Sequence, residues 1–356
     1  MAAKDKCIFQ PVGKHLFLLY SYGTGKYYLG GVSILPSAVK RMLDCCRIKT
    51  TLNQIDVEQI AKNAINPNTI DISVFKSPIV IGVMAVNQCN LCCKYCISAK
   101  GNGYSNTNVF PHKTDTLLNR INNSQIVSVI VSGGEPTLYN ELPFFLENMN
   151  QQNFSCFLDT NGVIISSAMI NILTKTDIIT RISLDSINEH EHNYNRGNFK
   201  ETLANIQRML DKDIQIRVNT VINSLNLKSM PSLADWLIQK RIRKWHIYKL
   251  QEKFAPREIW VDDNEVEAVI SSLIGVYGNK ITILCKYSHT NDGFSSFIID
   301  GEGNCFSTDN AANISQAKTD FGNIYNSDIS IIWQKTPLDY RLRHYSKFLS
   351  WEGKNT

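Results

Sequence analysis

The sequence predicts an α/β protein built on a parallel sheet, with a small unit before the sheet and another after it. Between about residues 78 and 255, short apolar segments alternate with segments of helical spacing, which predicts parallel strands joined by crossover helices. Two apolar-aromatic runs predict a hairpin before this region, and further strands follow it. We therefore expect three units in the 356 residues: 1–75, 76–255 and 256–356.

The first unit combines a hairpin with amphipathic helices. The hairpin is predicted in HLFLLYSYGTGKYYLGG, and ILPSAVKRMLDCC predicts a helix. A second helix is predicted to start at Asp56, which can cap it, with a hydrophobic staple between Ile55 and Ile60. The dipeptide Asn66-Pro67 then separates this unit from the sheet.

Six segments of the middle unit have the apolar pattern of short strands. They are PIVIGVMAV, IVSVIVS, FSCFLDT, ITRISLD, IQIRVNTVI and KWHIYKL, and segments such as ELPFFLENMN and MPSLADWLIQK between them have helical spacing. In folds of this kind functional groups gather at the carboxyl ends of the strands. Each motif described below lies at such an end.

Composition and charge narrow the class of protein. The chain is 43% hydrophobic and 19% charged, and no apolar run approaches the roughly 20 residues needed to span a bilayer. The start, MAAKDKCIFQ, lacks the apolar core of a secretory signal. The net charge of +5 is not gathered into a basic block, so a nucleic-acid partner is not indicated. We expect a cytoplasmic protein without a membrane partner.

Four of the ten cysteines crowd into eight positions, CNLCCKYC from Cys89 to Cys96, directly after the strand VIGVMAV. Such crowding indicates metal binding or redox chemistry. Three thiolates in a tight loop can hold three corners of a [4Fe–4S] cluster and leave one iron open, whereas zinc normally needs a fourth Cys or His. Two spacings are possible: Cys89-x3-Cys93-x2-Cys96 or Cys89-x2-Cys92-x3-Cys96.

The first spacing resembles the signature of the radical SAM superfamily, C-x3-C-x2-C with an aromatic residue, here Tyr95, before the last cysteine. The resemblance implies that Cys89, Cys93 and Cys96 ligate a [4Fe–4S] cluster whose open iron binds S-adenosylmethionine. It also implies reductive cleavage of that cofactor, hydrogen abstraction from a substrate by the resulting radical, and an external electron donor such as flavodoxin or ferredoxin. Cys92 is then a spare thiol.

Motifs at the next strand ends extend the resemblance. SGGEPT from Ser132 resembles the family's GGEP-type motif, DTNG from Asp159 its TNG turn, and SLDS from Ser183 with the later Arg-Gly pair its S-L-D…R-G pattern. The glycines allow close backbone approach. The resemblance places Ser183 near the ribose or carboxylate of the cofactor and Arg196 on the carboxylate. The implied cofactor contacts are Tyr95, Gly133, Gly134, Glu135, Pro136, Asn161, Ser183, Asp185, Arg196 and Asn219.

The third unit resembles the SPASM or twitch framework of peptide-modifying radical SAM enzymes, through FIIDGEGN, FGNI and the dipeptide IW. Only Cys285 and Cys305 lie in this region, and Thr308 stands where the usual motif has a cysteine. We therefore expect a degenerate SPASM-like α+β extension without a fully ligated auxiliary cluster. Cys285, Cys305 or Cys156 are candidate hydrogen donors in an epimerase.

The first unit resembles a winged-helix leader-recognition domain of the PqqD-like type, in the order of elements along LGGVSILPSAVKRMLDCC and TLNQIDVEQIAKNAI. Together the two resemblances imply a maturase that crosslinks or epimerises a ribosomally made precursor peptide. An exposed edge strand in the hairpin Leu16–Leu29 would hold the leader by strand addition. Two alternatives stay open: a radical SAM enzyme for a small molecule, and a non-catalytic iron–sulfur or zinc protein that binds a partner.

Overall fold

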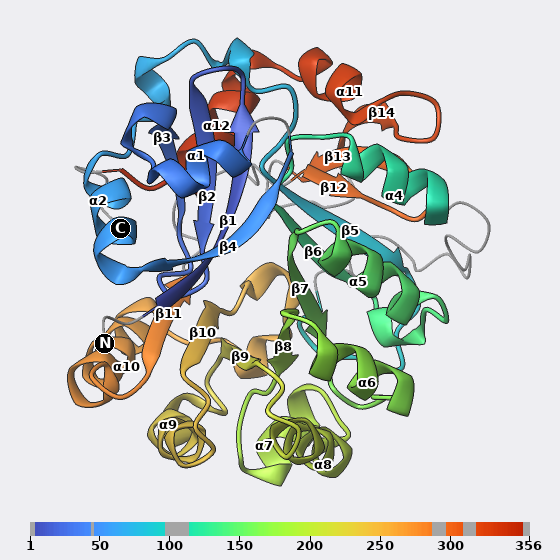
Figure 1. Cartoon of the computed structure of the whole chain (residues 1–356). Helices are drawn as coiled ribbons and strands as arrows, with labels where there is room; N and C mark the ends of the chain where they lie inside the picture. The colour runs from blue at the N-terminus through green and yellow to red at the C-terminus, as the bar shows by residue number, and fades with distance from the viewer. Residues whose placement is uncertain (1–3, 44–45, 97–113, 287–296, 309–317, 352–356) are drawn as a thin grey trace.

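The computed structural model describes residues 4–43, 46–96, 114–286, 297–308 and 318–351. Within this part of the chain the strands form two sheets, which Figure 1 shows side by side. The smaller sheet is antiparallel, and its order is β3 (Tyr27–Gly31), β2 (Leu16–Ser21), β1 (Lys4–Val12) and β4 (Ile48–Asn53). The pairing of β2 with β3 confirms the predicted hairpin, whereas β1 and β4 were not predicted.

Two helices, α1 (Ser37–Met42) and α2 (Gln54–Lys62), complete the first unit. The predicted start of the second helix is wrong. The helix begins at Gln54, and the Asn53 side chain caps it by accepting from the Asp56 backbone N–H at 2.8 Å. Ile55 is therefore already inside the helix and is 67% exposed, while Ile60 is buried. The predicted staple between these two isoleucines does not form.

The larger sheet contains the six predicted strands as parallel neighbours, which confirms them. It curves as a partial barrel (Figure 1). Its order is β11 (Thr282–Lys286), β10 (Lys244–Lys249), β9 (Ile216–Ile222), β8 (Ile179–Ser183), β7 (Ser155–Thr160), β6 (Ser128–Gly133), β5 (Val80–Val86), β12 (Phe297–Ile299), β13 (Asn304–Thr308) and β14 (Lys318–Asn323).

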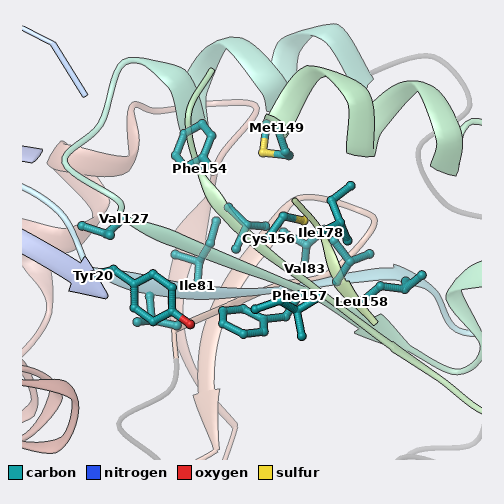
Figure 2. Packing of buried hydrophobic residues seen from close by; sticks show 14 of the residues in the cluster. Tyr20, Ile81, Val83, Val127, Met149, Phe154, Cys156, Phe157, Leu158 and Ile178 are labelled. Carbon is teal, nitrogen blue, oxygen red and sulfur yellow. The ribbon is translucent and has the colours of Figure 1, made fainter. Parts of the chain in front are cut away.

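Crossover helices cover the outer face of this sheet (Figure 1). They are α4 (Thr114–Asn122), α5 (Leu142–Gln151), α6 (Ser167–Lys175), α7 (Glu189–Asn195), α8 (Phe199–Leu210), α9 (Met230–Gln239) and α10 (Asp263–Tyr277). Figure 2 shows Met149 of α5 over Cys156, whereas Phe157 turns to the opposite, inner face beside Tyr20. Because side chains alternate along a strand, each strand contributes to both the helix-covered core and the inner face.

The third unit extends the same sheet. β12 pairs in parallel with β5 and antiparallel with β13. Two helices, α11 (Ile329–Lys335) and α12 (Leu338–Phe348), follow β14. The His344 ring of α12 accepts from the Ile79 backbone N–H at 3.1 Å, which attaches the helix to the start of β5.

The first unit is packed against the partial barrel. The buried Arg47 guanidinium donates to the backbone carbonyls of Ile126, Ser124 and Gln152 at 2.9–3.1 Å. The Tyr27 phenol donates to Ser128 at 2.7 Å. No helix in the described ranges is long and apolar enough to cross a membrane.

Candidate active site

The cysteine loop and the SGGEPT and DTNG turns meet at the carboxyl ends of β5, β6 and β7. The Glu135 backbone N–H donates to the Gln88 carbonyl at 2.7 Å. The Asn161 side chain donates to the Asn90 side chain at 2.8 Å. These contacts bring three motifs that are distant in sequence into one site, as strand-end placement predicted.

The two glycines of SGGEPT allow this turn to lie against the cysteine loop. Gly133 has a φ of +128°, and a Cβ added there would lie 2.3 Å from the Val86 carbonyl oxygen. At Gly134 the added Cβ would lie 2.1 Å from the Gln88 carbonyl oxygen. The close backbone approach expected of these glycines is therefore made to the protein's own cysteine loop.

The Glu135 carboxylate is buried and bonded to protein donors. It accepts from the Thr137 hydroxyl at 2.7 Å, the Thr160 hydroxyl at 2.6 Å and the Asn161 backbone N–H at 2.7 Å. Burial raises the pKa of this carboxyl, and the hydrogen bonds oppose that rise. Glu135 thus joins the β6 turn to the β7 turn through its carboxylate. Pro136, which follows it, is also buried.

Three of the four loop cysteines share one environment, and the fourth differs. Cys89, Cys93 and Cys96 are half-buried, whereas Cys92 is exposed. N–H groups point at two of the sulfurs: Leu91 N–H lies 3.4 Å and Asn161 Nδ2 4.0 Å from Cys89 Sγ, and Arg196 Nη1 lies 3.9 Å from Cys93 Sγ. Burial raises the pKa of the Cys89 thiol to about 11, so ligation must displace a proton.

The donor set fits a cluster better than a single ion. Across the described ranges, no three His, Cys, Asp or Glu side chains are grouped to hold one metal ion. In a [4Fe–4S] cluster each thiolate binds a different iron, so three thiolates need not converge on one point. Half-buried sulfurs with N–H donors directed at them match that requirement.

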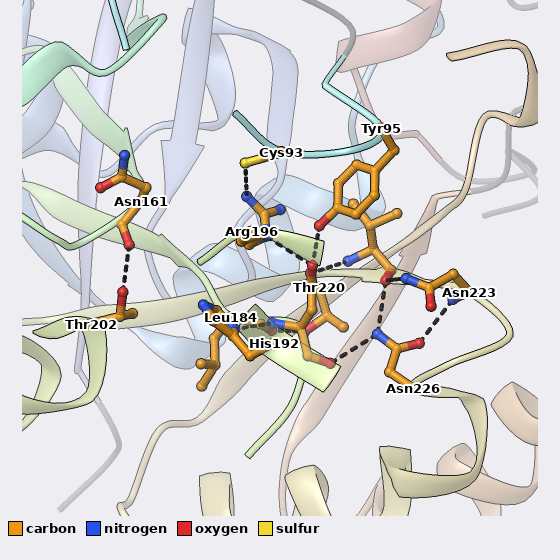
Figure 3. A network of polar contacts seen from close by, with 12 residues as sticks. Cys93, Tyr95, Asn161, Leu184, His192, Arg196, Thr202, Thr220, Asn223 and Asn226 are labelled. Carbon is orange, nitrogen blue, oxygen red and sulfur yellow. Dashed lines mark hydrogen bonds and ion pairs between the residues drawn. The ribbon is translucent and has the colours of Figure 1, made fainter. Parts of the chain in front are cut away.

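A buried ion pair lies beside the cysteine loop, and Figure 3 shows its Arg196 side chain next to Cys93 and Tyr95. The Arg196 Nε donates to the Asp185 carboxylate at 2.9 Å, and the Tyr95 phenol donates to the same oxygen. The other carboxylate oxygen accepts from the Val221 backbone N–H at 2.9 Å. Burial would lower the pKa of Arg196, but the Asp185 carboxylate raises it above its ordinary value.

Two of the expected cofactor contacts are bonded to each other in this structure. Asp185 is fully buried and its carboxylate contacts protein groups. Tyr95 is 7% exposed and its phenol faces Asp185. Arg196 keeps its place beside Cys93, where its Nη1 is directed at the sulfur.

Sequence reasoning missed a second layer of polar residues around Asp185 (Figure 3). The His192 Nδ1 accepts from the Asp185 backbone N–H at 3.4 Å, and Asn226 Nδ2 donates to the Asp185 and Val221 carbonyls, each at 2.9 Å. Burial lowers the pKa of His192 to about 4, so its ring is neutral at neutral pH. In the sequence, the signal for this layer would have been polar residues at buried positions after the strand-end motif SLDS.

Ser183 and Asn219 lie in register on neighbouring strands, on the inner face of the sheet, as expected of two cofactor contacts. Asn219 Oδ1 is 3.1 Å from Nδ1 of His246, which fixes the amide.

The candidate hydrogen donors lie elsewhere. Cys285 is in register with Ile247, one position out of phase with the His246–Asn219–Ser183 row, so its thiol points to the opposite face. Cys305 is fully buried and its thiol donates to the Gly303 carbonyl. Cys156 lies on the helix-covered face under Met149 (Figure 2). Strand alternation therefore does not support these thiols as donors to a radical on the inner face.

Comparison with known proteins agrees with this geometry. The model of the radical SAM superfamily matches residues 83–237. Fe-coproporphyrin III synthase of Methanosarcina barkeri strain Fusaro is 23% identical over 298 residues, which cover 72% of this chain and 74% of that protein.

Solved structures extend the similarity beyond the matched segment. Streptococcus suis SuiB bound to precursor peptide SuiA superposes with a TM-score of 0.69 at 15% identity, covering 93% of this chain and 88% of that one. The structure of anSMEcpe with bound AdoMet and Kp18Cys peptide gives a TM-score of 0.60 at 15% identity, covering 76% and 82%. At these identities the likeness shows a shared fold.

Proposed function

We infer that this chain, a radical SAM enzyme that uses a [4Fe–4S] cluster and S-adenosylmethionine, crosslinks or epimerises a ribosomally made precursor peptide. The observation that carries the peptide substrate is an open strand edge and groove on the first unit, described below. The bound cofactors supply the radical that abstracts hydrogen from the substrate. The chain's own residues hold the cluster, orient the cofactor and position the peptide.

Cluster ligation is assigned to Cys89, Cys93 and Cys96. Their half-buried sulfurs and the N–H groups directed at two of them support this set over one that includes the exposed Cys92. N–H donors that face cluster sulfurs stabilise the thiolate form. Cofactor contacts are assigned to the SGGEPT and DTNG backbones and to Ser183, Asn219 and Arg196.

The first unit, residues 1–75, is proposed to bind the leader of the precursor. The hairpin edge expected to do so is covered: Ile65 N–H donates to the Leu29 carbonyl and Ser350 N–H to the Tyr27 carbonyl, each at 2.8 Å. The leader-binding edge is therefore reassigned to β4, the other outer strand of the four-stranded sheet.

The backbone of β4 is oriented to accept a strand. Tyr22 N–H donates to the Lys6 carbonyl at 3.0 Å, so the polar backbone groups of Lys6 face β2. Thr51 is the antiparallel partner of Lys6 on β4. In such a non-hydrogen-bonded pair both residues turn their N–H and C=O groups away from each other. The Thr51 groups thus face outward, where an extended peptide would pair with them.

A groove beside this edge offers space for leader side chains. It has a volume of about 650 Å3, lies between α1 and β4, and is lined by Val39, Met42 and Leu52 among others. Met42 is 52% exposed although its side chain is apolar. An extended segment with apolar residues at alternate positions would pair with β4 and place those residues in the groove.

The test of peptide chemistry uses the full-length, cluster-loaded protein. It is incubated anaerobically with S-adenosylmethionine, a reductant and a synthetic peptide from a short reading frame encoded beside this one, and the peptide mass is measured. A crosslink removes two hydrogens, and epimerisation in heavy water adds one deuterium. Cofactor cleavage that is equally fast with and without peptide, with unchanged peptide mass, would refute the proposal.

The test of leader binding uses two variants at one position. Thr51→Pro removes the outward N–H without breaking a bond to β1, and Thr51→Val keeps the N–H as the matched control. Loss of one backbone hydrogen bond with added steric conflict should weaken leader affinity about tenfold in the proline variant. Equal affinity for both variants, with equal cluster content, would place the leader elsewhere.

A second candidate function is a radical SAM reaction on a small molecule. The 23% identity to Fe-coproporphyrin III synthase over 72% of the chain favours it. In that case the first unit is a structural cap, consistent with the Arg47 contacts to barrel carbonyls. The variant Thr51→Pro, which removes the outward N–H of β4, would then leave the turnover of the small molecule unchanged.

A further inference from the structure

A buried cation without a counter-charge lies at the amino-terminal end of the barrel strands, opposite the proposed active site. Arg217 is the second residue of β9, is 9% exposed and has no carboxylate at ion-pair distance in the described part of the chain. It is in register with Arg181 of β8. The two guanidinium groups lie 5.5 and 4.9 Å from the centroid of the same Phe157 ring.

The charges around Arg217 do not balance. Arg181 is paired with Asp159, with Nη2 and Oδ2 2.7 Å apart. A third cation, Lys244, donates to the backbone carbonyls of Tyr22 and Gly23 at 3.3 and 3.0 Å. Burial and the nearby Arg217 lower the pKa of Lys244 to about 8. Asp159 thus pairs with Arg181 and Asp5 attracts Lys244, which leaves Arg217 without an ion pair among the described carboxylates.

Three buried hydroxyl groups lie beside the same cation. The Tyr20 phenol interacts with Arg217 and Ser155, and the Tyr22 phenol with Ser155, although none of the three hydroxyls makes a well-formed hydrogen bond within the described residues. The Tyr20 ring lies 6.0 Å from Phe157 and 5.1 Å from Tyr22. Burial raises the pKa of both phenols, so they remain neutral donors. Figure 2 shows the Tyr20 hydroxyl directed toward Phe157 on the inner face.

The buried Arg217 charge and the hydroxyls beside it destabilise the folded chain unless a ligand binds to them. Buried polar groups are normally hydrogen-bonded, and buried charges are normally paired. Ordered water can satisfy the hydroxyls but leaves the Arg217 charge uncompensated. A bound anion satisfies both, because an oxyanion accepts from hydroxyl and guanidinium donors together.

We propose that Arg217, Tyr20, Tyr22 and Ser155 form a binding site for a small oxyanion, a carboxylate or phosphate, between the first unit and the barrel floor. The phenols come from β2 and the segment after it, and the cation and serine from β9 and β7. A bound oxyanion therefore connects the first unit to the barrel. This site lies apart from the cysteine loop and does not depend on the peptide substrate.

The test compares thermal unfolding of the full-length, cluster-loaded protein in sodium phosphate, sodium glutarate and sodium chloride at equal pH and ionic strength. The native chain should unfold roughly 3 °C or more higher in the phosphate or glutarate that binds than in chloride. Arg217→Met should lose this difference. The exposed Arg243→Met is the matched control for general salt effects and should retain the native response.

A second readout separates an anion site from a merely structural arginine. In chloride, Arg217→Met should unfold at the native temperature or above it, because it removes an unpaired buried charge. Tyr22→Phe, which removes one of the three hydroxyls, should halve the anion response or more while keeping stability in chloride. The proposal is overturned if Arg217→Met keeps the native response to both oxyanions, or if it lowers the unfolding temperature equally in all three salts. The salt with the larger effect identifies the preferred oxyanion.

Discussion

The ion pair between Asp185 and Arg196 can be tested by a double-mutant cycle. Their side chains are 0% and 12% exposed, and Arg196 Nε lies 2.9 Å from Asp185 Oδ2. Asp185→Asn keeps the shape but leaves Arg196 as an unpaired buried cation. Breaking one side of such a pair costs about 3–5 kcal/mol of unfolding free energy. Arg196→Met should cost a similar amount, because it leaves the Asp185 charge unpaired.

The double variant, which removes both charges, should lose less than the sum of the two single variants, with a coupling energy of about 1–3 kcal/mol. The measurement is anaerobic urea unfolding of cluster-loaded protein, followed by tryptophan fluorescence. Lys200→Met is the matched control, since its pair with Glu189 is exposed and should contribute about 0–1 kcal/mol. Additivity of the two single variants within about 0.5 kcal/mol would show that the pair does not act as a unit.

Three further predictions follow from the site. Cys93→Ala should lose cluster iron after anaerobic reconstitution and Cys92→Ala should keep it; the opposite pattern in iron content would reverse the ligand assignment. Gly134→Ala should displace the cysteine loop, because its Cβ would lie 2.1 Å from the Gln88 carbonyl oxygen; a variant with native iron content and thermal stability would contradict this. His192 has its pKa lowered from 6.5 to about 4 by burial, so the folded state binds fewer protons than the unfolded state between these values. Its contribution to stability is complete above pH 6.5 and is lost as pH falls toward 4, at up to about 1.4 kcal/mol per pH unit. His192→Asn should flatten that part of the curve of unfolding free energy against pH, and an unchanged slope would exclude the ring as its source.

Local patterns in the sequence were sufficient for the parallel strands and the cysteine loop. A strand such as PIVIGVMAV is recognisable because a parallel sheet buries both faces of the strand and so demands a continuous apolar run. The loop from Cys89 to Cys96 is recognisable because ligand spacing is a property of the chain itself. Strand ends in a parallel sheet share one edge, which is why motifs distant in sequence were expected to meet and do meet.

Tertiary structure decided what depends on partners distant in sequence. β4 is a strand because it pairs with β1 more than 35 residues earlier, and that pairing leaves Thr51 facing outward. Asp185 has the sequence context of a cofactor contact, but tertiary packing bonds its carboxylate to Tyr95 and Arg196. Cys285 has a reactive side chain, but sheet register turns it away from Asn219. Burial and register arise from long-range packing, so a pattern read along one segment of the chain does not contain them.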